Sequence, residues 1–325
     1  MKINNPYVKK IIKNPYAPPI IASIGLLIIG ESLTSGYISM NNISSLLMTA
    51  SILSLVAIGQ ATVVISGSAG IDMSVGAIMS MTALLGPTVA FASGFSVISL
   101  SVMIVYSVFL GGLVGLLNGM GTQLLKIAPL VMTLIMSNVV YGFTLLVTRG
   151  VPTLIISDEL QSVSMTLFGP IRLLTLIIVV LLFMAEYLLL RGSKFGRLLV
   201  LTGNNSNAAR LSGISVRLIS IAAYTFGGMM AGLAGLALVG FAGTAQMQMG
   251  RDYTLLSVAA VVIGGTKLSG GKGNYIGAAL GALVLVLLTS ILQTFNMPPG
   301  LRLFFQGLLL IIILMVNSRN AKLRQ

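Results

Sequence analysis

Six carboxylates are the only strong candidates for chemistry in a chain of 325 residues that has no cysteine and no histidine. The missing thiols and imidazoles exclude disulfides, thiol catalysis, imidazole bases and the usual zinc ligands. No paired-carboxylate arrangement supports acid–base or nucleophilic work, so an enzyme is the least favoured class of function. The six carboxylates are Glu31, Asp72, Asp158, Glu159, Glu186 and Asp252.

A glycine-rich stretch from Gly264 to Gly273, GGTKLSGGKG, invites comparison with a phosphate-binding loop. The spacing fails, because Thr266 stands five residues before Gly271 and Lys272 is followed by glycine instead of Ser or Thr. No acid that could hold magnesium lies nearby. We therefore expect no ATPase site, no metal and no cofactor in this chain.

Asp72 is the acid most nearly embedded in apolar sequence, where an ionisable group is a functional candidate. It also precedes a helix expected to start near Ser74, so it can cap that helix and brace the loop. Both interpretations stay open. If the chain crosses a membrane, the residues that could line or gate a path through it are Gln60, Ser66, Gly70, Asp72, Ser74, Asn118, Thr133 and Asn138.

Apart from Asp72, the polar residues of this path are uncharged. A proton- or sodium-driven carrier needs carboxylates near the membrane midplane, and none is convincingly present. The energy for transport is then expected from another protein. Uncharged groups also suit a neutral polyhydroxyl solute, although many such groups only bond helix to helix.

The longest polar interruption, Gly192–Arg217, separates two apolar blocks. Within it, Asn204 or Asn205 can cap a short helix from Ser206 to about Leu211. Gly213 can end that helix. A chain embedded in lipid would expose this helix to water, and we expect a motor protein to contact it there.

The composition, 56% apolar and 8% charged, indicates a polytopic membrane protein. Helices are required because hydrocarbon offers no partner for exposed backbone groups, and the repeated Gly and Pro argue against barrel strands. The expected fold class is an all-α polytopic integral membrane protein with about ten transmembrane helices, some short or broken. The expected spans are at about 18–36, 43–65, 74–93, 97–118, 128–148, 171–190, 217–241, 253–265, 275–294 and 301–316.

The net charge of +13 would suggest nucleic acid in a soluble domain, but these basic residues lie beside apolar spans, as cytoplasmic charges do. With a cytoplasmic N-terminus, fifteen of the nineteen basic residues fall inside the cell. We expect one permease domain over 1–325, with a cytoplasmic arm over 1–17, a cytoplasmic loop over 191–216 and both termini inside. The four basic residues left outside are Arg149, Arg172, Arg251 and Arg302.

Glycines recur at four-residue spacing, which lets helix backbones approach closely. Packing within the bundle and packing between subunits both remain open. The glycines are Gly111, Gly115 and Gly119, then Gly228 and Gly232, then Gly273, Gly277 and Gly281.

Two glycine-rich breaks resemble each other. Val63–Gly67 reads VVISG and Val261–Gly265 reads VVIGG, and each is followed by a Gly-Ala pair, at Gly76 and Gly277. Transporters often contain repeats with interrupted helices beside the substrate route, so the match indicates either a repeat or chance.

Three stretches carry a family resemblance. They are GIDMSVG (Gly70–Gly76), GNNSNAARLSGI (Gly203–Ile214) and VVIGGT (Val261–Thr266), the last leading to GGKG (Gly270–Gly273). In this order, over nearly the whole chain, they resemble the permease subunit of ribose/xylose/galactose-type ABC importers. The resemblance implies the ABC importer permease fold, a second permease copy, a cytoplasmic ABC ATPase and an extracytoplasmic solute-binding protein. It places the chain in the bacterial inner membrane.

The resemblance also assigns residues. The coupling helix, which seats in a cleft of the ATPase, maps to Asn204, Asn205, Ser206, Asn207, Ala208, Ala209, Arg210, Leu211 and Gly213. The family usually has an acid where this chain has Asn207, so a charge available to the ATPase is missing. Candidates for docking the binding protein are Arg149, Asp158, Glu159, Arg251 and Arg302. Interfacial snorkelling is the alternative for the arginines.

The sequence therefore predicts the permease subunit of an ATP-driven, binding-protein-dependent importer of a neutral sugar or sugar-like solute. ATP would bind to the partner, the lipid bilayer would surround the chain, and nucleic acid is not an expected partner. A self-contained secondary carrier or channel for a small polar solute is the alternative. The motifs do not distinguish pentoses, hexoses, polyols, cyclic signalling sugars or nucleosides, nor a homodimer from a heterodimer.

Overall fold

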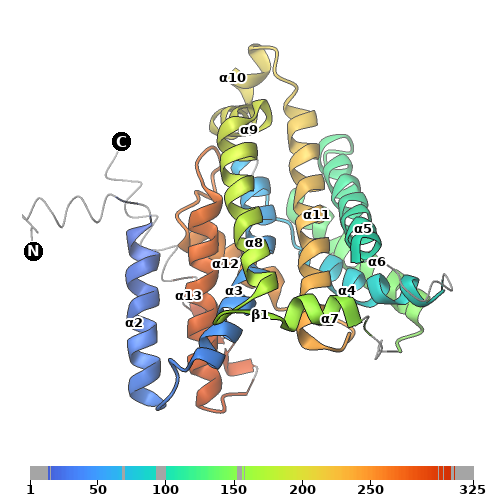
Figure 1. The fold of residues 1–325 in the computed structure, drawn as a ribbon. Coiled ribbons are helices and arrows are strands. Elements are labelled where there is room, and N and C mark those ends of the chain that lie inside the picture. The colour runs from blue at the N-terminus through green and yellow to red at the C-terminus, as the bar shows by residue number, and fades with distance from the viewer. Residues whose placement is uncertain are drawn as a thin grey trace, which may run out of the picture.

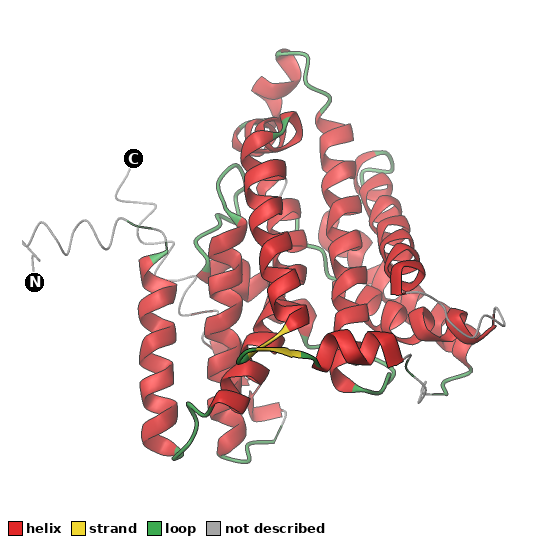
Figure 2. Ribbon diagram, in the orientation of Figure 1, coloured by secondary structure: helices red, strands yellow, loops and turns green. Residues whose placement is uncertain are grey.

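The computed structural model describes residues 14, 16–67, 70–92, 100–151, 156, 158–298, 300–302, 304–308 and 311. These residues are mostly helical (Figure 2), which confirms the all-α class of membrane protein. The strands among them are β1 (Leu167–Phe168) and β2 (Ile171–Arg172), which form an antiparallel hairpin. Most of the expected arm over 1–17 and part of the last expected span lie outside the described residues.

The helices follow the expected spans closely. Each of the first nine spans overlaps a helix, with α8 and the π-helix η1 together forming the sixth. The helices are α2 (Ala17–Leu33), α3 (Met40–Ile65), α4 (Val75–Ala92), α5 (Leu100–Gln123), α6 (Pro129–Thr148), α7 (Asp158–Met165), α8 (Leu173–Met184), η1 (Ala185–Gly192), α9 (Lys194–Asn204), α10 (Ser206–Leu211), α11 (Val216–Ala242), α12 (Tyr253–Ile263) and α13 (Tyr275–Thr294).

Six stretches in the described part of the chain are long and apolar enough to cross a membrane: α3, α5, α6, α8 with η1, α11 and α13. The expected count of about ten is therefore not confirmed. Two further apolar helices are shorter, at Ala17–Leu33 and Tyr253–Ile263, while α4 has 18 residues from Val75 to Ala92. With 11 residues, α12 is about 16 Å long, roughly half the thickness of a hydrocarbon core.

Helix α3 lies at the centre of the bundle. Its most apolar window is 94% buried, because α11, α13, α12 and α8 all pack around it. The corresponding windows of α5, α6 and α8–η1 are only 33%, 22% and 28% buried. Their exposed faces carry large apolar side chains, as a surface in contact with lipid requires.

Helices α5 and α11 approach through glycines at four-residue spacing. A Cβ at Gly111 would overlap the carbonyl of Gly228, and a Cβ at Gly228 would overlap the carbonyl of Gly111. One turn along, a Cβ at Gly115 would overlap the carbonyl of Tyr224. These glycines thus serve packing within the chain, the first of the two interpretations of their spacing.

The two glycine-rich breaks have the same local geometry. α3 and α12 each end just before a glycine with positive φ, 91° at Gly67 and 85° at Gly265. The amide of Gly67 donates to Val64 O at 3.1 Å, and the amide of Gly265 donates to Val262 O at 3.0 Å. This correspondence favours a structural repeat with an interrupted helix in each half.

The polar segments lie toward opposite ends of the bundle (Figure 1). α9 and α10 project at one end. α7 packs against α11 and α8 toward the other end, next to the β-hairpin. The expected coupling loop and the expected outer segment are thus separated along the helix axes.

Replacing Gly111 by valine should destabilise the bundle, because the new side chain would force α5 away from α11. We expect a cost of about 1–3 kcal/mol, the usual penalty for overpacking. The measurement is the midpoint temperature for loss of monodisperse protein in detergent. Gly142→Val is the matched control, since a Cβ at Gly142 of α6 meets nothing within 4 Å. Equal midpoints for the two variants would contradict this account of the packing.

Candidate functional site

Asp72 is fully buried in the segment between α3 and α4. Its Oδ1 accepts hydrogen bonds from Ser74 N at 2.8 Å and from Ser74 Oγ at 2.6 Å. Both bonds go to the residue before α4, so Asp72 braces the turn that leads into the helix. Its Oδ2 has no hydrogen-bond partner among the described residues.

Three helices hold this segment in place. Gln60 of α3 brackets Asp72, its amide nitrogen donating to Asp72 O at 3.2 Å and its amide oxygen accepting from Asp72 N at 3.1 Å. Asn118 of α5 donates from Nδ2 to Ser74 Oγ at 2.8 Å. Thr133 of α6 accepts from the amide of Met73 at 3.1 Å. Bonds to backbone fix the path of the loop between the helices.

We call this group the Asp72 cluster; its members are Gln60, Asp72, Ser74, Asn118 and Thr133. All five side chains are fully buried. Five of the eight residues assigned to the path from sequence therefore meet at one place. In the described part of the chain, Asp72 Oδ2, Asn118 Oδ1 and the nearby Tyr224 hydroxyl of α11 lack hydrogen-bond partners. The cluster is thus only partly satisfied.

The other three path residues lie outside the Asp72 cluster. Ser66 ends α3, where its hydroxyl donates to Val63 O at 2.7 Å. Gly70 donates from its amide to Gly67 O at 3.2 Å. Asn138 lies further along α6, exposed, with Nδ2 donating to Leu134 O at 3.2 Å.

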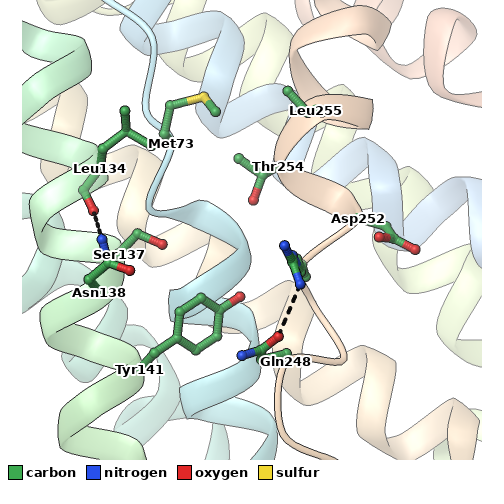
Figure 3. A pocket seen from close by; sticks show the side chains of 10 residues that line it. Met73, Leu134, Ser137, Asn138, Tyr141, Gln248, Asp252, Thr254 and Leu255 are labelled. Atoms are coloured by element: carbon green, nitrogen blue, oxygen red, sulfur yellow. Dashed lines mark hydrogen bonds between the residues drawn. The ribbon is translucent and has the colours of Figure 1, made fainter. Parts of the chain in front are cut away.

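Asn138 lines a cleft of about 640 Å³ beside the Asp72 cluster. Figure 3 shows Asn138 and Tyr141 of α6 on one side, and Gln248 and Thr254 on the other. Met73 reaches the cleft from the braced segment, so the cleft and the cluster share one stretch of chain. The lining residues are Met73, Leu134, Ser137, Asn138, Tyr141, Gln248, Arg251, Asp252, Thr254 and Leu255.

The two breaks meet the end of α9 at four glycines, Gly67, Gly203, Gly270 and Gly271, which we call the glycine junction. A Cβ at Gly67 would lie 2.9 Å from Gly203 Cα, and a Cβ at Gly270 would lie 2.6 Å from Gly67 Cα. The amide of Gly271 donates to Ile65 O, the end of α3, at 3.0 Å. The backbones touch directly, so no larger side chain fits.

The short helix expected at the central loop is confirmed as α10, Ser206–Leu211. Asn205 caps it, with Oδ1 accepting from the amides of Asn207 at 3.1 Å and Ala208 at 3.0 Å. Gly213 ends it with φ of 80°, as expected for a left-handed C-terminal residue. The sequence analysis did not predict α9, although Ser193 caps it through a bond from Gly196 N at 3.0 Å.

The exposed face of α10 is defined by Leu211, which is 90% exposed, and by its neighbour Arg210. Ala209 is only 6% exposed and faces the protein. Asn207 is exposed and uncharged. Of the residues matched to the coupling helix, Arg210 and Leu211 therefore offer the most direct contact to a partner.

Glu186 pairs with Arg191 at 2.7 Å between Oε1 and Nε. Its second oxygen, which sequence reasoning missed, accepts from the amide of Tyr275 at 2.8 Å. Tyr275 is the first residue of α13, and its hydroxyl lies 2.8 Å from Thr62 Oγ1 of α3. The buried carboxylate thus ties η1 to α13 and indirectly to α3.

The candidate docking residues have separate surroundings. Asp158 and Glu159 begin α7, as expected for first-turn acids, and Glu159 accepts from the amide of Leu100 at 3.1 Å. Arg149 follows α6 in a left-handed conformation, and Arg302 has a buried Nε without a partner among the described residues. Arg251 lines the cleft.

Comparison with known proteins identifies the family. The family model "branched-chain amino acid transport system / permease component" matches residues 42–314. The chain is 30% identical to the ribose import permease protein RbsC of Escherichia coli K12, over 93% of both chains. It is 34% identical to the autoinducer 2 import system permease protein LsrC of Escherichia coli O9:H4, over 96% of this chain and 89% of that protein.

The ribose import permease protein RbsC of Bacillus subtilis is also similar, at 31% identity over 93% of this chain and 92% of that protein. No solved structure matches. The chain belongs to this permease family, and within it to the permeases of sugar ABC importers. It is a multi-pass inner-membrane protein.

Replacing Asp72 by alanine should remove the two bonds to Ser74 and lower the free energy of unfolding. We expect about 1–3 kcal/mol, the cost of leaving a buried hydrogen-bond donor unsatisfied. Asp72→Asn is the matched control because it keeps an acceptor oxygen. The midpoint of thermal unfolding in detergent measures both variants. If Asp72→Asn is as unstable as Asp72→Ala, bracing by this oxygen is the wrong explanation.

Proposed function

We propose that this chain is the permease subunit of an ATP-driven, binding-protein-dependent importer that moves a neutral sugar or sugar-like solute into the cell. The observation that carries the proposal is the position of α10. It projects from the apolar bundle, exposes Leu211, and follows α9, which ends at the glycine junction. The relatives support the solute class, since their names specify ribose and autoinducer 2 import.

The proposed arrangement has about ten spans in one domain, both termini in the cytoplasm and a cytoplasmic loop over 191–216. A separate ATPase binds the nucleotide, so this chain needs no ATPase site, cofactor or metal of its own. A second permease copy completes the membrane core. An extracytoplasmic binding protein delivers solute to the opposite end, where α7 begins with Asp158 and Glu159.

The ATPase contact rests on the shape and chemistry of α10. Leu211 presents a large apolar side chain with a basic neighbour, Arg210. An apolar anchor that fills a pocket usually dominates such an interface. Ala209 faces inward, so a bulky residue there would disturb α10 itself and test coupling poorly.

Movement of α10 would reach both breaks through the glycine junction. α10 follows α9 with only Asn205 between them, so a displacement of α10 pulls on Gly203. Gly203 touches Gly67 of the first break, and Gly270 of the second break touches Gly67 as well. Direct backbone contact transmits displacement well because no flexible side chain lies between the segments.

The first break continues into the Asp72 cluster, where the displacement would have its effect. The unpartnered atoms there, including Asp72 Oδ2 and Asn118 Oδ1, can form bonds in a second arrangement of the loop. In alternating access, the transport path opens to one side of the membrane and then to the other, which requires a segment with two stable arrangements. The cluster is therefore the proposed inner gate.

A self-contained carrier is the second candidate, because Asp72 is a buried carboxylate with one unpartnered oxygen. Buried carboxylates of this kind couple protons or sodium in ion-driven carriers. Liposomes that contain this chain alone separate the two functions. Uphill solute uptake driven by an ion gradient there would overturn the ATP-driven proposal.

Replacing Leu211 by aspartate should weaken binding to the ATPase, because a charge would enter an apolar contact. The loss of one anchoring side chain costs about 2 kcal/mol or more, so the dissociation constant should rise more than about tenfold. Leu211→Met is the control that keeps an apolar side chain. Copurification with the ATPase and sugar uptake measure the effect. Equal uptake by both variants would discard α10 as the contact.

Replacing Gly203 by alanine should uncouple the importer, because the new Cβ would overlap Ile65 O. We expect the ATPase still to bind the complex, since α10 is unchanged, while loaded binding protein no longer stimulates ATP hydrolysis. Gly25→Ala in α2 is the control, because nothing lies within 4 Å of a Cβ there. Normal stimulation in Gly203→Ala would show that the glycine junction transmits nothing.

A further inference from the structure

The cleft lies between α6 and the start of α12. The chain leaves α11 at Gly243 and returns inward, so that Gly250 and Arg251 lie beside the first turn of α4. A Cβ at Gly76 would lie 2.6 Å from Gly250 O and 3.2 Å from Arg251 Cα.

The α6 wall of the cleft is polar where a lipid-facing helix would be apolar. Asn138 lies at the middle of α6 and is exposed, and it uses one amide hydrogen on Leu134 O. Its amide oxygen makes no bond within the described residues. Ser137 and Tyr141 line the same wall. Polar side chains at this depth face protein or water-filled space, not hydrocarbon.

The opposite wall of the cleft contains the guanidinium of Arg251, which is bonded to an uncharged side chain, that of Gln248. Arg251 donates from an Nη to Gln248 Oε1 at 3.4 Å, and Gln248 has a positive φ of 63°. Arg251 forms no ion pair in the described part of the chain. The carboxylate of Asp252 is directed away from Asn138 and Tyr141 (Figure 3). The remaining guanidinium donors are therefore available to the cleft.

We propose that this cleft is a binding site for the transported solute, an uncharged polyhydroxyl molecule held by Asn138, Tyr141, Gln248 and Arg251. This inference rests on the proposed function and adds the place of binding. A cleft of about 640 Å³ falls within the roughly 300–1,000 Å³ typical of small-molecule sites. Amide, hydroxyl and guanidinium groups match the donors and acceptors of sugar hydroxyls.

The charges of the cleft disfavour an amino acid, the solute class that the family description names. A zwitterion needs an anionic group facing its ammonium as well as a cation facing its carboxylate. Asp252 also lines the cleft, but its carboxylate is directed away from Asn138 and Tyr141 in Figure 3, whereas the guanidinium of Arg251 bonds Gln248 within the lining. Arg251 then acts in solute selection, in place of the docking role that its expected outer position suggested.

The cleft is also connected to the proposed inner gate, the Asp72 cluster, through Met73. Met73 lines the cleft, while its amide is bonded to Thr133 and its neighbours in sequence are Asp72 and Ser74. A solute that contacts Met73 therefore acts on the loop Gly70–Ser74. The glycine junction acts on the same loop through Gly67. Binding and coupling converge on five residues, Gly70–Ser74.

The absence of cysteine from the chain allows a direct test. Leu134→Cys puts one thiol into the cleft wall without removing a polar contact. The complete importer, reconstituted in liposomes with its ATPase and binding protein, is treated from outside with a membrane-impermeant maleimide. We expect labelling, slowed by D-ribose or xylitol. At a solute concentration equal to Kd the rate should fall about twofold, because half of the sites are occupied.

Three further substitutions control the experiment. Phe143→Cys is nine residues further along α6, on the opposite and lipid-facing side, and should not react. Arg251→Gln in the Leu134→Cys chain should abolish protection by the polyols, and Asn138→Leu, which leaves Arg251 in place, should do the same. Labelling of Leu134→Cys that is absent, unaffected by polyols or slowed by L-leucine would overturn the site. Failure of the proposed function is distinct, since the wild-type importer would then take up no sugar.

Discussion

At the glycine junction, three separate parts of the chain touch backbone to backbone. Gly203, the last glycine of α9, lies against Gly67 of the first break, and Gly270 of the second break closes the contact. A single methyl group would separate these segments. The geometry of both breaks, and hence of the Asp72 cluster, depends on this contact, because the amide of Gly271 also completes the end of α3.

Local order elsewhere comes from polar groups that the apolar bundle excludes from water. Asp72 braces its turn, Glu186 ties η1 to the start of α13, and Gln60 brackets a loop backbone. In hydrocarbon, such groups have no solvent to replace a lost partner, so each bond restricts the conformations available. The cleft is different, since Asn138 and Arg251 keep free hydrogen-bonding capacity. Rigid and open polar regions thus lie side by side.

The sequence predicted what depends on near neighbours. The cap of α10 by Asn205 joins residues within three positions, and the end of α10 at Gly213 is equally local. The bond from Met73 N to Thr133 spans 60 residues, and the one from Tyr275 N to Glu186 spans 89. No local pattern encodes such contacts, and the sequence identified Thr133 only as an uncharged residue on a span.

The number of membrane-crossing helices also depends on long-range structure that the local sequence does not encode. Hydropathy located α12, yet it could not show that this helix of 11 residues is too short to cross alone, because length in lipid depends on where the chain turns. The return of the chain to Arg251 was likewise hidden, since a basic residue between two apolar stretches has the pattern of an outer loop. In the structure Arg251 lies beside the first turn of α4.

Exposure of Leu211 has a consequence for assembly in the cell. In the proposed arrangement Leu211, which is 90% exposed, would be a bare apolar side chain at the tip of a cytoplasmic helix, and unassembled copies would be open to degradation there. Copies made in excess of the ATPase would present this tip unprotected, whereas assembled copies would hide it. The same side chain would then both receive force and set the stoichiometry at which the subunits accumulate.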